Sequence, residues 1–304
     1  MENKFFKSAL PVWADSRDKE MNVSVELTYS AKDLKNATLT LTGATFYQVY
    51  LGEKLLHFGP AKKAIGYAGV DVIPLPDVDE GTIYIRVAGY YCKCYNGVIT
   101  SSFVQAEIEQ NGELLAATGK GGFECLLYTP KLQKVMRYSH QRQFSECYDL
   151  CRKPIKTLFT EVDPGVTLIP RNVDLADLDV KPARYIASAP YTMQEEVKHP
   201  LRGYQTGPTC EYAPNQFPYE ELESKPFVEY LKMVPDYSAE CKRGTAGTVE
   251  HWDLGKIEAG FVTVKVNAKT DSRIIAVFGE QNAPDGRPNP IPVNATNAVE
   301  WKLP

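Results

Sequence analysis

The feature that most constrains this chain is an alternation of apolar and other side chains through its first half. Five short runs carry the pattern, and their apolar positions are Val23, Val25, Leu27 and Tyr29; Leu39 and Leu41; Tyr47, Val49 and Leu51; Ile83, Ile85 and Val87; and Val104, Ala106 and Ile108. Because successive side chains of a strand point to opposite faces, alternation over runs this short predicts strands that bury one face. Helix patterning is nearly absent here, so this half is predicted to form an antiparallel β-sandwich.

Two Asn-Gly pairs mark turns in this half. Asn96-Gly97 and Asn111-Gly112 each lie between two alternating runs. The dipeptide readily adopts the positive φ angles of a two-residue hairpin turn. Residues 82–118 are therefore predicted to form an antiparallel meander.

The second half begins with a Pro-rich stretch. Nine prolines lie within residues 153–220, and proline removes a donor from a strand ladder, so most of this stretch is predicted to be an extended connection. Residues 224–234 predict one short helix, with Ser224 as its cap and Pro226 in its first turn. Strand patterning then returns in three runs, 248–255, 260–268 and 272–280, which predicts a second, smaller sandwich.

The predicted fold class is all-β. Residues 1–152 are expected to form the first antiparallel, jelly-roll-like sandwich. Residues 153–304 are expected to supply the extended Pro-rich connection and the second sandwich. At most one or two short helices are expected. The last run, with Val299, Trp301 and Leu303 in alternation, reads as a strand whose apolar side forms a border where a further domain docks.

Composition and charge exclude several classes of partner. The net charge is −4 and no long run of Lys and Arg is present, so no nucleic-acid partner is expected. No stretch approaches the roughly 18 apolar residues of a membrane helix, and residues 1–20 lack the apolar run of a signal peptide. We therefore expect no membrane partner, a cytoplasmic location and reduced cysteines. Cys92 and Cys94 could hold a soft metal, but a closed site needs about four ligands, so no metal or other cofactor is expected.

Four segments resemble a known family. They are TGATFYQVYLGEKLLHFGPA (42–61), RYSHQRQFSECYDL (137–150), LIPRNVDLADLDV (168–180) and HWDLGKIEAGFVTVKVNAKTDSRIIAVFGE (251–280). Together they resemble the N-terminal, non-catalytic β-sandwich region of bacterial α-L-rhamnosidases, with one departure at Gly52, where the family often has Asn-Gly. None of these segments is catalytic in that family, and sandwich modules of this kind occur in many proteins.

The resemblance implies a role beside a catalytic domain. In that family an α/α toroid with the acid and base carboxylates follows the second sandwich, and we expect it after residue 304. Inverting glycoside hydrolysis needs two such carboxyl groups about 6.5–9.5 Å apart. No catalytic residue is therefore assigned within this chain.

The function implied is that of an accessory region of a glycoside hydrolase of the α-L-rhamnosidase type. Its partners would be the catalytic domain of the same polypeptide and, through the parent enzyme, a rhamnose-containing carbohydrate. Two alternatives stay open. One is a free-standing carbohydrate-binding protein, and the other is a structural or assembly module that binds no sugar.

The candidate carbohydrate-binding residues are aromatic and polar side chains. Tyr138, His140, Arg142 and Phe144 share one face if residues 135–150 form a strand, and sugars stack on aromatic rings and hydrogen-bond planar polar groups. A strand packed on a neighbouring module, with Arg142 paired to a carboxylate, explains the same stripe and is the commoner arrangement. Trp13, beside Pro11, is expected to be free for exposure and joins the candidates. Trp252, inside a strand pattern, is expected in a core or an interface.

Overall fold

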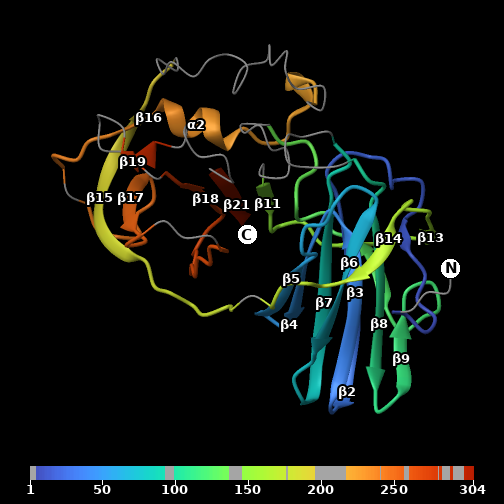
Figure 1. Cartoon of the computed structure of the whole chain (residues 1–304). Helices are drawn as coiled ribbons and strands as arrows, with labels where there is room; N and C mark the ends of the chain where they lie inside the picture. Colours follow the sequence, from blue (N-terminus) through green and yellow to red (C-terminus); the bar gives the residue numbers. More distant parts are fainter. Residues whose placement is uncertain are drawn as a thin grey trace. The chain divides into compact units, whose positions relative to one another are not determined.

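The computed structural model is mostly β-sheet, as the sequence predicts, and the part of the chain that it describes contains one short α-helix. The described residues are 5–92, 99–136, 146–175, 177–195, 217–239, 241–256, 260–279, 281–282, 288–289 and 298–304. The chain divides into two compact units (Figure 1). Unit 1 comprises Met1–Gln133 and Arg152–Leu178, and unit 2 comprises Lys134–Cys151 and Asp179–Pro304. This division differs from a single boundary at residue 152, because Lys134–Cys151 belongs to unit 2 although the following segment, Arg152–Leu178, belongs to unit 1.

The larger sheet of unit 1 has seven strands in the order β13-β1-β8-β3-β6-β14, with β9 beside β8. Their bounds are β1 Val12–Ala14, β3 Ala37–Ala44, β6 Tyr67–Pro74, β8 Phe103–Gln110, β9 Glu113–Ala117, β13 Phe159–Glu161 and β14 Thr167–Pro170. Neighbouring strands are antiparallel except β14, which runs parallel to β6.

The second sheet of unit 1 has six antiparallel strands in the order β12-β10-β2-β7-β4-β5. Their bounds are β2 Val23–Leu34, β4 Phe46–Leu51, β5 Lys54–Gly59, β7 Val78–Gly89, β10 Glu124–Leu127 and β12 Ile155–Lys156.

The two sheets pack face to face through the side chains whose alternation predicted the strands. Leu39 and Leu41 of β3 and Val25 and Leu27 of β2 are completely buried in one common core. Burying a side chain of this size stabilises the fold by roughly 1.5–3 kcal/mol. The predicted first sandwich is thus confirmed for unit 1, with its inward faces read correctly from the sequence.

The turn chemistry is confirmed in one place and the meander is wrong. Asn111 and Gly112 have φ angles of 51° and 85° and join β8 to β9 as a hairpin. However, β7 pairs with β2 and β4, whereas β8 belongs to the other sheet. The chain therefore changes sheets between Gly89 and Phe103, and alternation cannot reveal this because it identifies a strand but not its sheet. Asn96-Gly97 lies outside the described residues.

The Pro-rich stretch begins as edge strands of unit 1. β12, β13 and β14 lie at ends of the two sheets, with Pro170 at the end of β14. Edge positions suit proline because its missing N–H faces no partner there, and the added strands cover backbone that would otherwise be unpaired. The stretch is therefore more than a connection, since it completes both sheets of unit 1.

Unit 2 holds smaller sheets among the described residues, in the orders β11-β21-β18, β16-β15-β17 and β19-β20. Their bounds are β11 Glu146–Asp149, β15 Arg184–Met193, β16 Met233–Pro235, β17 Thr248–Asp253, β18 Ser272–Val277, β19 Gln281–Asn282, β20 Pro288–Asn289 and β21 Ala298–Leu303, and a 3-10 turn spans Tyr219–Glu221. β21 runs parallel to β11 and antiparallel to β18. As the middle strand of its sheet it buries Val299 and half-buries Trp301 and Leu303, and the docking of a further domain at this border stays a prediction.

One long strand crosses the Pro-rich stretch. β15 is the central strand of its sheet although it contains Pro190. Pro190 lies where pairing with β17 ends and pairing with β16 begins, and its carbonyl accepts a hydrogen bond from the Asp236 N–H at 2.8 Å. A change of partner at the proline explains how a central strand tolerates it.

The three strand runs predicted for unit 2 have different outcomes. Two of them form β17 and β18. The third, 260–268, is not a strand, and its apolar side chains Phe261, Val262, Val264 and Val266 are exposed. Alternating apolar residues become a strand only where neighbouring backbone pairs with them.

The predicted helix is present as α2, Pro226–Lys232, with proline in its first turn. Its cap is Lys225 rather than Ser224, because the buried Ser224 hydroxyl bonds to Glu300 of β21 instead. Tyr230 and Leu231 pack with Ala298 and Val277, so the helix covers the β18–β21 sheet. No helix in the described part of the chain is long and apolar enough to cross a membrane.

Candidate functional site

The predicted aromatic stripe cannot be compared with the structure. Tyr138, His140, Arg142 and Phe144 all lie outside the described residues. Their carbohydrate-binding role stays a prediction.

Trp13 is buried, so its expected exposure is wrong. β1 lies between β13 and β8, and the indole points into the core of unit 1 with none of its surface exposed. Space for the ring comes from Gly89, where an added Cβ would lie 2.7 Å from the indole carbon Cζ2 of Trp13. Neighbouring sequence gave no sign of this, because β1 is only three residues long.

Trp252 was expected in a core or an interface, and only the core alternative is wrong. Its side chain is 36% exposed and therefore does not belong to a core. It faces Tyr185 across the β15–β17 pair, with the ring centroids 5.4 Å apart and the rings at 73° in an edge-to-face arrangement. Such a pair contributes more stabilisation than the burial of its apolar area alone would give.

The loop 241–247 is fastened over this aromatic pair. Ser188 donates a hydrogen bond to the Cys241 carbonyl at 2.7 Å and is itself 2.8 Å from the Tyr185 hydroxyl. Glu250 accepts hydrogen bonds from the Gly244 N–H at 2.6 Å and from the indole Nε1 of Trp252 at 3.0 Å. The carboxylate thereby fixes both the loop and the orientation of the indole.

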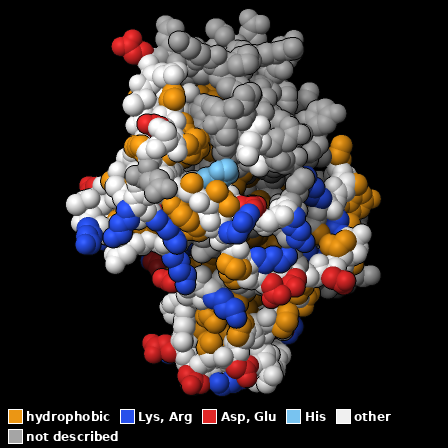
Figure 2. Space-filling view, turned by 90° about the vertical axis from the view of Figure 1, so that its left-hand side faces the viewer, with side chains coloured by type: hydrophobic (Ala, Val, Ile, Leu, Met, Phe, Trp, Pro, Cys, Tyr) orange, Lys and Arg blue, Asp and Glu red, His pale blue; other side chains and the backbone are white. Residues whose placement is uncertain are grey.

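Arg243 of this loop contacts both rings of the aromatic pair. Its guanidinium lies 4.6 Å from the ring centroid of Trp252 and 5.7 Å from that of Tyr185. We call Tyr185, Arg243, Glu250 and Trp252 the aromatic platform. Figure 2, which views the side where β15 and β17 lie in Figure 1, shows hydrophobic side chains interleaved with Lys and Arg. A surface of this composition suits a ligand with both an apolar face and polar groups.

A second cluster surrounds Arg86 on the outer face of the six-stranded sheet. Its guanidinium lies 5.0 Å from the ring centroid of Tyr50, 5.7 Å from that of Tyr84 and 4.6 Å from that of Tyr128. Its Nε donates to Glu26 at 2.6 Å. Glu26 and Tyr128 are buried, and this ion pair therefore satisfies the guanidinium internally. The cluster joins β2, β4 and β7 to the chain after β10, which is a packing role.

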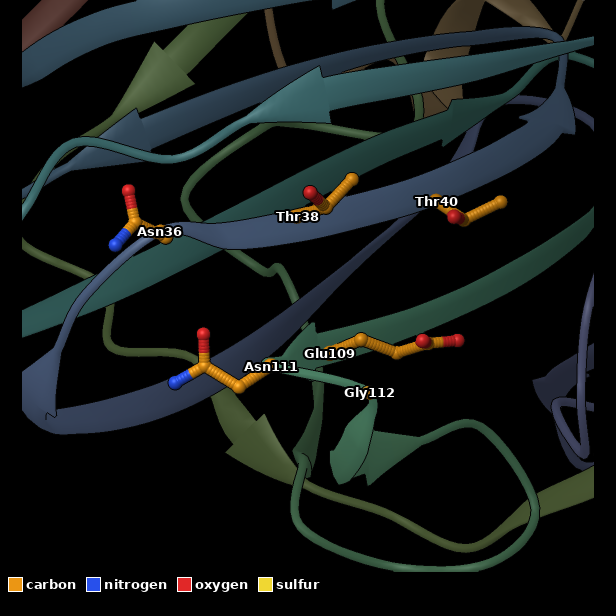
Figure 3. Close-up of a pocket in the computed structure, with 6 residues that line it drawn as sticks. All are labelled: Asn36, Thr38, Thr40, Glu109, Asn111 and Gly112. Carbon is orange, nitrogen blue, oxygen red and sulfur yellow. The ribbon is translucent and has the colours of Figure 1, made fainter.

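A polar pocket lies at one end of the seven-stranded sheet (Figure 3). Its volume is about 380 Å³, and its lining consists of Asn36, Thr38, Thr40, Glu109, Asn111 and Gly112. Lys7 closes on this end, with its Nζ 2.5 Å from Glu109 and 3.1 Å from the Gly112 carbonyl. The lining offers hydroxyl and amide groups but no ring on which a sugar could stack, so it is the weaker candidate.

A buried polar network lies within unit 1. The carboxylate of Asp71 accepts hydrogen bonds from Tyr47, from His57 Nε2 at 2.8 Å and from Arg171 Nη1 at 2.9 Å. Asp71 and His57 are almost wholly buried. Burial raises the pKa of Asp71, but the hydrogen bonds from His57, Tyr47 and Arg171 outweigh it, and the net pKa lies below the ordinary value.

The network fastens β14 to the sandwich. Arg171 follows β14 directly, so its ion pair with Asp71 ties that edge strand to β6 in addition to the backbone ladder. Lys63 reinforces the attachment through Asn172 and the Pro170 carbonyl. The role is structural. Among the described residues, no group of three or more His, Cys, Asp and Glu side chains could hold a metal ion.

Comparison with known proteins gives a likeness of fold. No protein-family model matches the chain, and neither does any curated protein. Among solved structures, the GH78 family rhamnosidase of Bacillus sp. GL1 matches with a TM-score of 0.51 and 16% identity over 62% of this chain. The α-L-rhamnosidase from Dictyoglumus thermophilum gives a TM-score of 0.48 and 13% identity over 98% of the chain. The Streptomyces avermitilis α-L-rhamnosidase complexed with L-rhamnose gives 0.45 and 14% over 93%.

The likeness covers only part of each larger structure. The chain spans 22% of the Bacillus protein, 30% of the Dictyoglumus protein and 25% of the Streptomyces protein. At 16% identity the first match is one of fold alone.

Proposed function

We propose that this chain is an accessory β-sandwich region of an α-L-rhamnosidase-type glycoside hydrolase, and that it contacts carbohydrate without cleaving it. The observation that carries the proposal is the fold likeness to the Bacillus rhamnosidase, which extends over 62% of this chain but only 22% of that protein. A region of that extent leaves most of a rhamnosidase to other domains. The sequence segments that resemble the family's N-terminal region support the same assignment.

Three of the described carboxyl groups have a pKa that makes them unsuited to the role of a general acid. Asp71, Asp236 and Asp253 all have a pKa below the ordinary value. The cause for Asp71 is given above. Hydrogen bonds from Ser238 lower the pKa of Asp236, and the hydrogen bond from Arg184 lowers the pKa of Asp253. A general acid for glycoside hydrolysis needs the opposite shift, because it must carry a proton at neutral pH.

Contact with carbohydrate is supported by the aromatic platform. Sugar rings have apolar faces that stack on aromatic side chains and hydroxyl rims that bond to polar groups. The exposed ring of Trp252 and the guanidinium of Arg243 provide both on one surface.

A hydrolysis assay tests the non-catalytic part of the proposal. The complete chain is incubated with p-nitrophenyl α-L-rhamnoside, and p-nitrophenol release is measured against a buffer blank. We expect release indistinguishable from the blank. Sustained release that disappears when a single carboxylate of this chain is changed to its amide would contradict the proposal.

A further inference from the structure

We propose that the aromatic platform of unit 2 is a binding site for an acidic saccharide, one that carries a carboxylate such as a uronic acid. The inference rests on the proposed function, since it identifies the surface and the chemical class of the carbohydrate contact. It starts from Arg243, whose guanidinium lies over an aromatic ring and forms no ion pair among the described residues.

The guanidinium of Arg243 is available to a ligand. Within the described part of the chain it makes cation–π contacts with Trp252 and Tyr185 and forms no ion pair. The residue is exposed. By contrast, Arg86 is paired with Glu26, Arg171 with Asp71 and Arg184 with Asp253. A guanidinium has five N–H donors in a planar fork that matches a carboxylate, and these donors are uncommitted in Arg243.

The carboxylate nearest in the platform does not compete for Arg243. One oxygen of Glu250 accepts from the Gly244 N–H and the other from the indole of Trp252. Its hydrogen bonds therefore hold the loop and the ring, and within the described residues no ion pair joins it to Arg243. The result is a cation beside an exposed aromatic ring on a surface whose parts are already held in place.

This arrangement selects for a sugar that carries a carboxylate. The part of Trp252 that stays exposed beside Arg243 offers apolar contact to a pyranose, and the Arg243 fork binds a carboxylate on its rim. A neutral sugar would satisfy the ring and leave the guanidinium with weaker acceptors. Because the loop and the aromatic pair are fixed by hydrogen bonds, little ordering is needed on binding.

The test is a titration of the complete chain with a trimer of galacturonic acid and with its methyl ester, in which each carboxylate is replaced by an uncharged ester that is larger by one methyl group. We expect the acid to bind at least about tenfold more tightly than the ester, because a hydrogen-bonded charge pair is lost in the ester. Arg243→Gln should reduce binding of the acid to the level of the ester. Trp252→Ala should weaken both ligands.

Two control variants keep the effects specific. Arg184→Gln removes a cation from the opposite face of the same strand pair, and Tyr67→Ala removes an exposed ring of β6 in unit 1. Both should bind the acid as the unchanged chain does. Circular dichroism and thermal melting show whether each variant is folded. A further variant, Arg243→Lys, keeps the charge but loses the planar fork, so its affinity for the acid should lie between those of Arg243→Gln and the unchanged chain.

The binding results separate a failure of the acidic-saccharide site from a failure of the proposed function. Equal binding of the acid and the ester, or unchanged binding by folded Trp252→Ala, overturns the acidic-saccharide site. If the chain binds neutral rhamnose-containing oligosaccharides and neither galacturonate ligand, this inference fails while the proposed function stands. If it binds no carbohydrate of any kind, the carbohydrate contact proposed for the chain fails as well.

Discussion

Asp71→Asn is the substitution whose effect on the free energy of unfolding follows most directly from the structure. The substitution keeps the shape of the side chain but removes the charge that Arg171 is paired with at 2.9 Å. It also weakens the hydrogen bonds from Tyr47 and His57, both of which are buried. Removing one partner of a buried ion pair costs about 3–5 kcal/mol, because the other charge is left uncompensated. Since Arg171 keeps some contact with solvent and the amide oxygen still accepts one bond, we expect about 3 kcal/mol.

The assay is urea unfolding followed by tryptophan fluorescence. Trp13 is the tryptophan of unit 1 and is completely buried, while Trp252 and Trp301 belong to unit 2. Changing those two to phenylalanine makes the signal report on unit 1. In this background Asp71→Asn should lower the free energy of unfolding by about 3 kcal/mol. Asp79→Asn, which removes an exposed carboxylate paired with Lys35, is the control and should cost less than about 1 kcal/mol.

A double-mutant cycle and a pH series complete the experiment. Arg171→Met combined with Asp71→Asn should give a coupling energy of about 1–3 kcal/mol, because the two groups are in contact. The pKa of Asp71 in the folded state lies below its ordinary value of 3.8. Its contribution is therefore present above that value and is lost as the pH falls through the lower folded pKa, so the difference between the two proteins should shrink there. A loss of under about 0.5 kcal/mol at neutral pH would refute this account of the network.

Three further predictions follow from particular positions. Gly59→Ala should destabilise unit 1 by about 2–3 kcal/mol in the same urea assay, because the new Cβ would lie 2.5 Å from Asp71 Oδ2 and 2.6 Å from the Tyr47 hydroxyl; Gly52→Ala, with φ +55° and open space, should cost only about 1 kcal/mol, and equal losses would contradict the steric argument. Burial, with a further contribution from Glu124, raises the pKa of Cys125 from 9.0 to about 11, so iodoacetamide at pH 8 should modify it about a hundredfold more slowly than in urea, as peptide mass spectrometry would show; equal rates would be the contrary result. Leu41→Ala, in the core, should cost about 2–5 kcal/mol of unfolding free energy, and Val72→Ala, at an exposed position, under about 0.5 kcal/mol; equal losses would contradict this assignment.

The strands of unit 1 could be predicted because their inward faces obey a simple period. Val25, Leu41 and Ile85 were assigned to buried positions from alternation alone, and all three are buried. Alternation did not reveal which sheet each strand joins, because pairing depends on partners that are distant in the sequence. β7 and β8 belong to different sheets for this reason, although they are consecutive alternating runs.

The candidate site was harder to predict because its parts meet only in three dimensions. Trp13, expected to be exposed, lies in the core because a three-residue strand carries it there, and Trp252 is partly exposed beside a surface loop rather than in a core. Arg243 gave no signal, because a loop residue acquires a ring partner only after β15 and β17 pair. Asp71 was detectable in principle, as a single charge in the apolar run YAGVDVIP that needs a buried partner.

The most direct test of the central claim is an equilibrium titration of the complete chain with a rhamnose-containing oligosaccharide and with the same oligosaccharide after removal of its rhamnose. An accessory region of a rhamnosidase that contacts carbohydrate should bind the first oligosaccharide and leave it uncleaved, with a heat of binding that saturates as the sites fill. The second ligand should bind more weakly. No detectable heat with either oligosaccharide would contradict the claim and favour a module that serves assembly alone.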